Sequence, residues 1–332
     1  MRDSGLLQRR RGYYWRRFAA ITSALAGTVT LSWVIGDSWR QLLLAPLVAL
    51  LITQIAFLGH DAAHRQIFTS GRRNDVASRV LSGLFAGLSH GWWLGKHNVH
   101  HAAPNQIGRD TDIHSKVLAF YPEAVQTRRG PHAWVLRRQG FLVFPLLLLE
   151  GFNLHFDSTT SLLRRSGPKQ RWVELSMTLA RWAVYVGLAT AFMSTPKAIT
   201  FIAVDLACFG VFLGGAFLPN HTGMPIVPKG LKVDFLHRQV LSSRNVSGGR
   251  VVEFFMGGLN HQVEHHLFPN MPRPNLRLVQ PLVREFCATH SIVYSEATPA
   301  AAFAEIVRYL NRVGLGARRQ RSCPLAAQLR GS

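Results

Sequence analysis

Eight of the 15 histidines in this chain lie in three short motifs, which read HDAAH at residues 60–64, HNVHH at 97–101 and HQVEHH at 261–266. Residues three and four apart share one face of a helix, so each motif would present its histidines together if it is helical. Imidazole is a common ligand for iron, copper, nickel and zinc. The three motifs hold more imidazoles than one four-coordinate zinc ion needs. They therefore favour two metal ions with vacant coordination positions.

Acidic residues lie near these motifs and could hold the imidazole rings in place. A metal-bound histidine usually donates its second ring nitrogen to a carboxylate or carbonyl oxygen. The candidates for this supporting role are Asp61, Asp110, Asp112 and Glu264. The alternative for each of them is an ordinary solvent-exposed charge on a helix. Ligands rich in nitrogen disfavour magnesium and calcium, which prefer oxygen. Zinc remains an alternative, but three motifs favour a redox pair such as two iron ions. Single histidines such as His132 are expected to be structural.

Long apolar runs must position the motifs. Four segments approach the roughly 20 apolar residues that cross a bilayer, at residues 18–35, 41–58, 172–193 and 198–218. The first two are so close together that they predict a hairpin of two spans and not a cleaved signal peptide. A further run at 140–152 is too short to cross, and it predicts an interfacial or half-buried helix.

The basic residues are distributed unevenly around these spans. Of 38 lysines and arginines, 35 lie before the first span, between the second and third, or after the fourth. Only Arg40 and Lys197 lie in the two opposite loops. Such a bias places the basic segments in the cytoplasm. Both termini and all three histidine motifs are then predicted on the cytosolic side, where distant parts of the sequence could share one metal centre.

The composition supports this topology. Hydrophobic residues make up 48% of the 332 residues and charged residues 17%, with a net charge of +21. That charge alone would suit a nucleic-acid-binding protein, but the apolar runs argue against it. The three cysteines form no CxxC motif, which excludes a cysteine zinc site. We predict an all-α integral membrane protein with four transmembrane helices in two hairpins, interfacial helices and a cytosolic helical cap. Its predicted parts are a basic cytosolic segment at 1–17, a membrane domain at 18–290 and a cytosolic tail at 291–332.

The three motifs, in this order around two apolar hairpins, resemble the histidine boxes of membrane fatty-acid desaturases. The match extends to WWLGKHNVHHAAPN at 92–105 and GGLNHQVEHHLFPNMPRPNL at 257–276. The resemblance implies a cytosolic di-iron centre that removes two hydrogens from an acyl chain with O₂ and two electrons. The ligands it implies are His60, His64, His97, His100, His101, His265, His266 and, from FLPNHTGMP at the end of the fourth span, His221.

The third motif departs from the commonest desaturase box, because Gln262 stands where the first histidine is usual. Such a glutamine is typical of front-end desaturases and related acyl-lipid enzymes. Gln262 is expected to orient a metal-bound water or a neighbouring ligand through its amide. His261, directly before it, is an alternative ligand, for which we favour a packing or supporting role.

The resemblance also implies partners. The short Arg-rich N-terminus has no room for the cytochrome b5 domain fused to many front-end enzymes, so a separate ferredoxin or similar protein with its reductase should supply electrons. The expected substrate is a fatty acyl chain in the lipid bilayer, and no nucleic acid is expected. The use of arginine over lysine and the missing haem domain suggest a bacterial plasma membrane.

Two other functions remain open. A di-iron hydroxylase or ketolase of acyl chains or carotenoids would use the same boxes, because these reactions diverge only after the first hydrogen is removed. A histidine-rich metal transporter would instead place its ligands near the bilayer midplane. The histidine motifs lie outside the spans, which disfavours the transporter.

Overall fold

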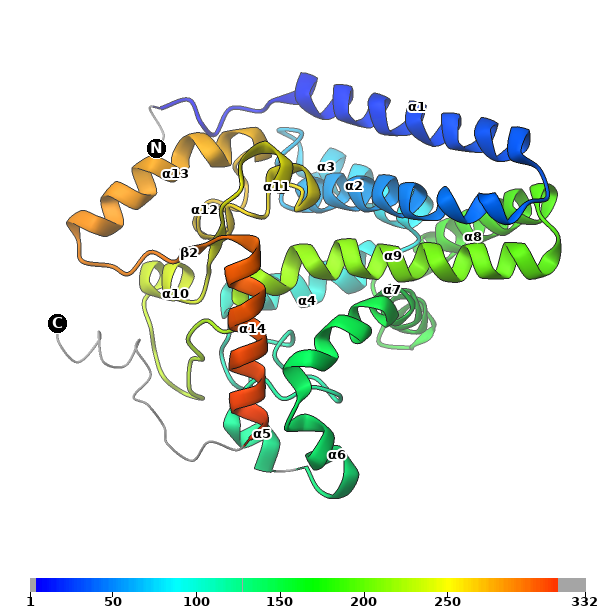
Figure 1. Ribbon diagram of the computed structural model, residues 1–332. Helices are drawn as coiled ribbons and strands as arrows, with labels where there is room; N and C mark the ends of the chain where they lie inside the picture. The colour runs from blue at the N-terminus through cyan, green and yellow to red at the C-terminus, as the bar shows by residue number, and fades with distance from the viewer. Residues whose placement is uncertain (1–3, 127, 316–332) are drawn as a thin grey trace. The chain divides into compact units, whose positions relative to one another are not determined.

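The computed structural model describes residues 4–126 and 128–315, and the regular secondary structure of these residues is almost entirely helical. The helices, shown in Figure 1, are α1 (Arg11–Ile35), η1 (Trp39–Leu43), α2 (Ala45–Ala63), α3 (Gly71–Arg79), η2 (Val80–Ala86), α4 (His90–Ala102), α5 (Pro122–Gln126), α6 (Gly130–Leu136), α7 (Gln139–Leu163), α8 (Arg171–Phe192), α9 (Thr195–His221), α10 (Phe235–Leu241), α11 (Gly249–Phe255), α12 (Gln262–Leu267), α13 (Arg273–Thr289) and α14 (Pro299–Gly314). Two short strands, β1 (Asn245–Val246) and β2 (Glu296–Ala297), pair in parallel. The predicted all-α class is confirmed.

Among the described residues, five segments are long and apolar enough to cross a membrane: α1, η1 with α2, α7, α8 and α9. Four of them correspond to the predicted spans, so a multi-pass membrane protein is confirmed. The apolar run at 140–152 differs from its prediction, because it belongs to the 25-residue helix α7. The helix continues past the apolar run because its polar side chains find partners. His155, for example, is buried and its ring nitrogens contact the carbonyl oxygens of Gly151 and Ala86.

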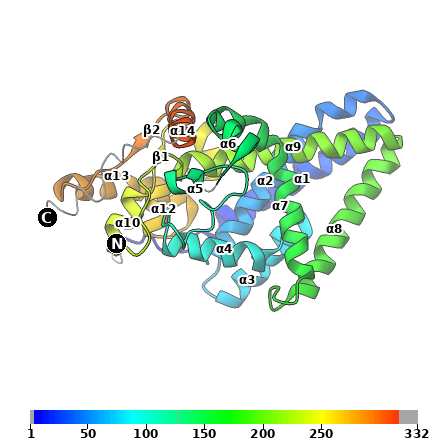
Figure 2. The same ribbon diagram turned by 90° about the horizontal axis from the view of Figure 1, so that it is seen from below.

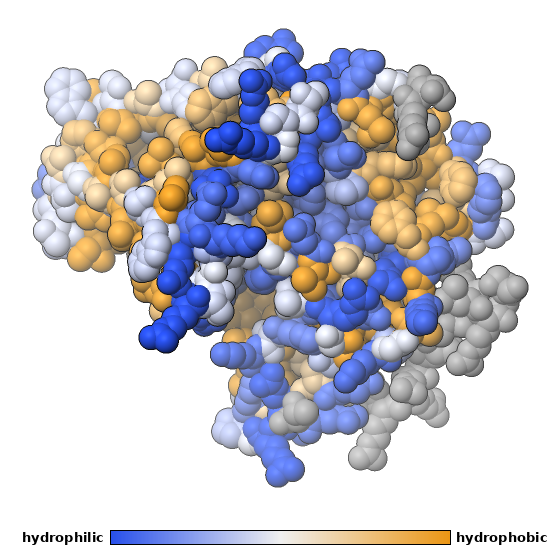
Figure 3. Space-filling model, turned by 180° about the vertical axis from the view of Figure 1, so that it is seen from behind, coloured by the Kyte–Doolittle hydropathy of each residue, from blue (hydrophilic) through white to orange (hydrophobic). Residues whose placement is uncertain are grey.

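The described residues form two compact units. The first unit, residues 4–95, 147–215 and 270–275, contains both predicted hairpins, α1 with α2 and α8 with α9 (Figure 2). The turn after α1 lies against the turn between α8 and α9. Asp37 in the first turn accepts a hydrogen bond from the Ser194 amide at 2.8 Å and pairs with Lys197 at 3.0 Å. The surface of the long helices near the α8–α9 turn is mostly hydrophobic, as Figure 3 shows at upper left. That surface suits contact with lipid chains.

Glycines allow α7 and α9 to pack closely within the first unit. A Cβ atom on Gly210 would overlap the backbone of Leu147, and one on Gly151 would overlap the backbone of Leu206. Small residues let helix backbones approach in this way inside membranes, where burial of apolar area gives little driving force. The close contact between α7 and α9 therefore depends on glycine, which has no side chain, at positions 151 and 210.

The second unit comprises residues 96–146, 216–269 and 276–315. The buried side chain of Gln139 donates to the carbonyl oxygens of Ala119 and Leu310 and accepts from the Ala119 amide. It thereby ties α7 to α14, a helix that lies inside the predicted C-terminal tail. The rest of that tail, residues 316–332, lies outside the described residues. Buried Arg244 binds the carbonyl oxygens of Pro219 and Thr222 and so holds the end of α9.

Candidate metal centre

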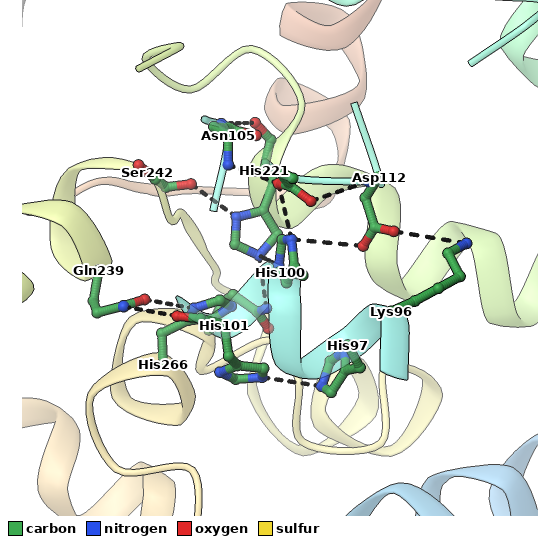
Figure 4. Close-up of polar contacts among 12 residues, drawn as sticks. Lys96, His97, His100, His101, Asn105, Asp112, His221, Gln239, Ser242 and His266 are labelled. Carbon is green, nitrogen blue, oxygen red and sulfur yellow. Dashed lines mark hydrogen bonds and ion pairs between the residues drawn. The ribbon is translucent and has the colours of Figure 1, made fainter. Parts of the chain in front are cut away.

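Helix α4 carries the second histidine motif in its last two turns. The Nε2 atoms of His97 and His101 are 3.0 Å apart, as the spacing of four residues in a helix predicts. His100 lies between them and points to a different set of partners (Figure 4). The helical interpretation of this motif is therefore confirmed.

Three histidines from three helices each have the Nδ1 atom engaged by an oxygen. Nδ1 of His100 in α4 lies 3.0 Å from a carboxylate oxygen of Asp110. Nδ1 of His221, the last residue of α9, lies 2.8 Å from the Ser242 carbonyl oxygen. Nδ1 of His266 in α12 lies 2.8 Å from Oε1 of Gln239. Each oxygen can accept a hydrogen bond from Nδ1–H, which leaves the Nε2 lone pair of each ring available.

These three Nε2 atoms converge. The ligand atoms that His100, His221 and His266 offer lie within 4.8 Å of one another. The Nε2 atoms of His100 and His221 are only 3.2 Å apart. Nε2 of His266 is buried and has no hydrogen-bond partner among the described residues. Two lone pairs at this distance repel unless a proton or a metal ion lies between them, and an orphaned buried nitrogen is costly. The donor set therefore fits a transition-metal ion.

The surroundings of these three rings keep His266 neutral and place carboxylates beside His100. Burial and the neighbouring imidazoles, first of all His101, hold the pKa of His266 well below its ordinary value. Burial alone would lower the pKa of His100, but the hydrogen bond and charge of Asp110 and the charge of Asp112 raise it. Metal binding requires a neutral imidazole, so His266 is ready for it at neutral pH. The carboxylates beside His100 would balance part of a metal ion's charge.

The loop after α4 holds Asp110 in place. Its carboxylate accepts from the backbone amides of Asn105 at 2.7 Å and Asp112 at 3.0 Å. The Asn105 side chain also donates to the His221 carbonyl oxygen at 3.1 Å, which ties the loop to the end of α9. Asp112 is half exposed and lies 3.5 Å from Nδ1 of His100 and 3.8 Å from Lys96. Asp110 is thus better placed than Asp112 for the supporting role predicted for both.

Gln262 lies against a predicted ligand. Its Nε2 atom is 2.9 Å from Nε2 of His221, and its Oε1 atom accepts from the Asn220 side chain at 3.1 Å. The bond from Asn220 fixes which end of the amide faces the histidine. Gln262 therefore presents a donor to the ring nitrogen of His221.

A second group of rings lies beside the first. The ring centroids of His101 and His265 are 4.8 Å apart, and those of His97 and His265 are 6.4 Å apart. His101 also stacks on His266 at 4.2 Å. Helix α12 ends at Leu267, two residues before Pro269, as the prolines after the third motif predict. The second and third motifs are thus brought together in the second unit.

Two other candidates from the third motif face away from these rings. His261 lies near Arg277 and Gln280 of α13. Burial and the charge of Arg277 lower its pKa to about 4, although a hydrogen bond with Gln280 opposes this shift. Glu264 accepts from the side chains of Asn245 and Tyr294, both at 2.7 Å. Neither of these residues belongs to a cluster of possible ligands in the described structure.

The first motif lies in the first unit, at the end of α2. The rings of His60 and His64 are 4.6 Å apart, and Trp93 packs edge-on against His60 at 5.3 Å. Asp61 contacts Nδ1 of His60 at 3.4 Å and forms an ion pair with buried Arg273 at 2.6 Å. Asp61 therefore has the neighbours that its predicted supporting role requires.

Sequence reasoning did not find three of the groups that orient the rings. Gln239 lies in α10, which is distant in sequence from every histidine motif. Ser242 contributes only its backbone carbonyl oxygen. Asn220 acts through Gln262. Nothing in their spacing distinguishes these residues from ordinary polar positions.

The family model described as Fatty acid desaturase matches residues 37–298, most of the chain. The chain is a member of the fatty acid desaturase family. It is 31% identical over 314 residues to an acyl-lipid (9-3)-desaturase of Physcomitrium patens, covering 91% of this chain and 58% of the relative. A Delta(5) fatty acid desaturase of Caenorhabditis elegans is 30% identical over 261 residues, covering 73% of this chain and 56% of the relative. This desaturase family member thus spans less than two thirds of the length of these relatives.

Proposed function

We propose that this desaturase introduces a carbon–carbon double bond into a fatty acyl chain at a centre of two iron ions. The observation that carries the proposal is the convergence of three histidine Nε2 atoms whose Nδ1 atoms are already bound to oxygen acceptors. Relatives named as desaturases of acyl lipids, fatty acids and sphingolipids support the reaction type.

The proposed iron ligands are His60, His64, His97, His100, His101, His221, His265 and His266. Two bound iron ions would activate O₂ and so allow hydrogen to be removed from an unactivated methylene group. The protein must keep these imidazoles neutral, fix the direction of each ring and exclude water from the acyl chain. Burial serves the first need, and the acceptors Asp110, Ser242 and Gln239 serve the second.

We propose that Gln262 orients a metal-bound water through its amide and is not itself an iron ligand. Nε2 of His221 can accept the amide hydrogen bond only while no metal ion is bound to it, so beside a bound ion the amide would face a water molecule. The contacts with His221 and Asn220 support this role. An amide is a poorer iron ligand than imidazole. Gln262→Leu should lose most product because the polar contact is gone, whereas Gln262→His should retain some. Full activity of the leucine variant would remove Gln262 from the centre and make His261 the better candidate.

The cytosolic orientation and the electron source are also proposals. The excess of lysine and arginine in three segments supports cytosolic termini and a cytosolic metal centre. The same basic surface would attract an acidic electron carrier such as a ferredoxin. The relatives named above are eukaryotic, so a bacterial source remains a prediction from composition alone.

Lipid profiling of cells that express the chain tests the proposed reaction. Wild-type protein should produce a fatty acid with one more double bond, and His100→Ala should abolish that product while the protein still inserts into the membrane. His132→Ala is the matched control, because His132 is half-buried away from the three histidine motifs and its ring contacts the Val117 carbonyl oxygen at 3.1 Å. A new hydroxyl group would indicate a hydroxylase instead. Equal activity of the two variants at equal expression would contradict the ligand assignment.

A further inference from the structure

An apolar cavity of about 710 Å³ lies within the first unit, between α1, α3, η2 and the end of α2. Its volume falls within the range of about 300–1,000 Å³ that is usual for small-molecule sites. The cavity is open on one side, and exposed Trp15 and Val76 stand among its lining residues. All lining residues belong to the first unit, so the cavity is formed without the second unit.

The cavity floor is a well-packed apolar cluster. Leu58, Ile67 and Leu81 are buried there, and Phe18 packs against Phe85 with ring centroids 5.6 Å apart. Such a surface favours a flexible hydrocarbon chain, since each methylene group removed from water adds to binding. The walls therefore suit an acyl chain better than a polar metabolite.

Two cations stand at the edge of this apolar cavity. Arg72 and Arg73 line it together with Ser70, and no acidic residue is among the lining residues. Both arginines are exposed, and neither guanidinium has a hydrogen-bond or ion-pair partner in the described structure. They lie in the first turn of α3, which contains no acidic residue. Positive side chains at a helix N-terminus are repelled by the positive end of the helix dipole. A bound anion would therefore be stabilised there both by the two arginines and by the dipole.

We infer that this cavity binds one anionic glycerophospholipid, with an acyl chain against the apolar floor and the phosphate on Arg72 and Arg73. An apolar cleft with a cationic edge matches a molecule that has a long hydrocarbon chain and a charged phosphodiester head group. The guanidinium group is well suited to phosphate because its planar fork can donate two parallel hydrogen bonds. The lipid site does not depend on the proposed iron chemistry.

Photocrosslinking of the full chain in detergent tests the site. The probe is phosphatidylglycerol with a diazirine on one acyl chain, and labelled peptides are located by mass spectrometry. Labels should fall on residues 14–18 and 76–81, and unlabelled phosphatidylglycerol should compete better than phosphatidylcholine. The double variant Arg72→Gln/Arg73→Gln should weaken binding about 25-fold, because each arginine near an anionic lipid contributes about fivefold.

The matched control is Arg164→Gln/Arg165→Gln, which removes the same charge from two exposed arginines elsewhere in the first unit. It should leave binding unchanged. Ala77→Trp, which fills the cavity without changing charge, should reduce labelling by the phosphatidylglycerol probe. Labels outside the two segments, equal competition by phosphatidylcholine, or equal weakening by both arginine pairs would overturn the proposal. In a parallel experiment with a protein–protein cross-linker, links between two copies of the chain through α1 and α3 would show that the surface serves a dimer instead.

Discussion

Replacing Gln239 by leucine tests whether an amide outside the histidine motifs prepares the metal centre. Gln239 is 1% exposed, accepts from Nδ1 of His266 at 2.8 Å and donates to the His101 carbonyl oxygen at 2.9 Å. Leucine has a similar volume but can make neither bond. Each buried group left without a partner costs about 1–3 kcal/mol, so the free energy of unfolding should fall by about 2–6 kcal/mol. Loss of such a supporting contact also lowers metal affinity by about 10–100-fold.

The assay separates these two effects. Purified protein is equilibrated with graded free Fe²⁺, and bound iron is measured by mass spectrometry per mole of folded protein. Gln139→Leu is the matched control, because Gln139 is equally buried and makes three hydrogen bonds in the same unit without touching a histidine. Both variants should be destabilised, but only Gln239→Leu should lose iron affinity. Wild-type iron affinity in folded Gln239→Leu protein would refute the proposed role, as would an equal loss in both variants.

Three further changes have definite expected outcomes. Asp110→Asn keeps the shape of the side chain but weakens its acceptor, so iron affinity should fall by about tenfold or more in the same titration. Gly210→Ala should lower the thermal unfolding temperature through an overpacking cost of about 1–3 kcal/mol, whereas Gly215→Ala, which has open space, should not. Tyr294→Phe removes a hydrogen bond to the buried Glu264 carboxylate and should cost about 1.5–3 kcal/mol in chemical unfolding. Unchanged values would contradict each expectation.

The helices and the histidine groups could be predicted from the sequence because both depend on local spacing. Apolar runs of sufficient length specify spans, and residues four apart specify a shared helix face. The contact between His97 and His101 follows from that spacing alone. The end of α12 before Pro269 follows from the fixed backbone of proline.

The supporting contacts could not be predicted, because they depend on tertiary packing. The partner of His221 is the backbone carbonyl oxygen of Ser242, a group that every residue possesses. Glu264 resembles a supporting carboxylate in sequence, yet it binds Tyr294 and Asn245, which come from distant segments. The length of α7 was underestimated for a related reason. Its polar second half is helical because residues such as His155 find partners both within α7 and in η2.

Iron-edge anomalous diffraction from crystals of the purified protein, with its metal content measured in parallel, tests the central claim most directly. We predict about two iron ions per chain, as a two-metal site requires. One anomalous peak should be bound by the Nε2 atoms of His100, His221 and His266, which converge within 4.8 Å. Stoichiometric zinc without iron in protein that still desaturates lipid would contradict the claim. Iron peaks remote from these three rings would contradict it equally.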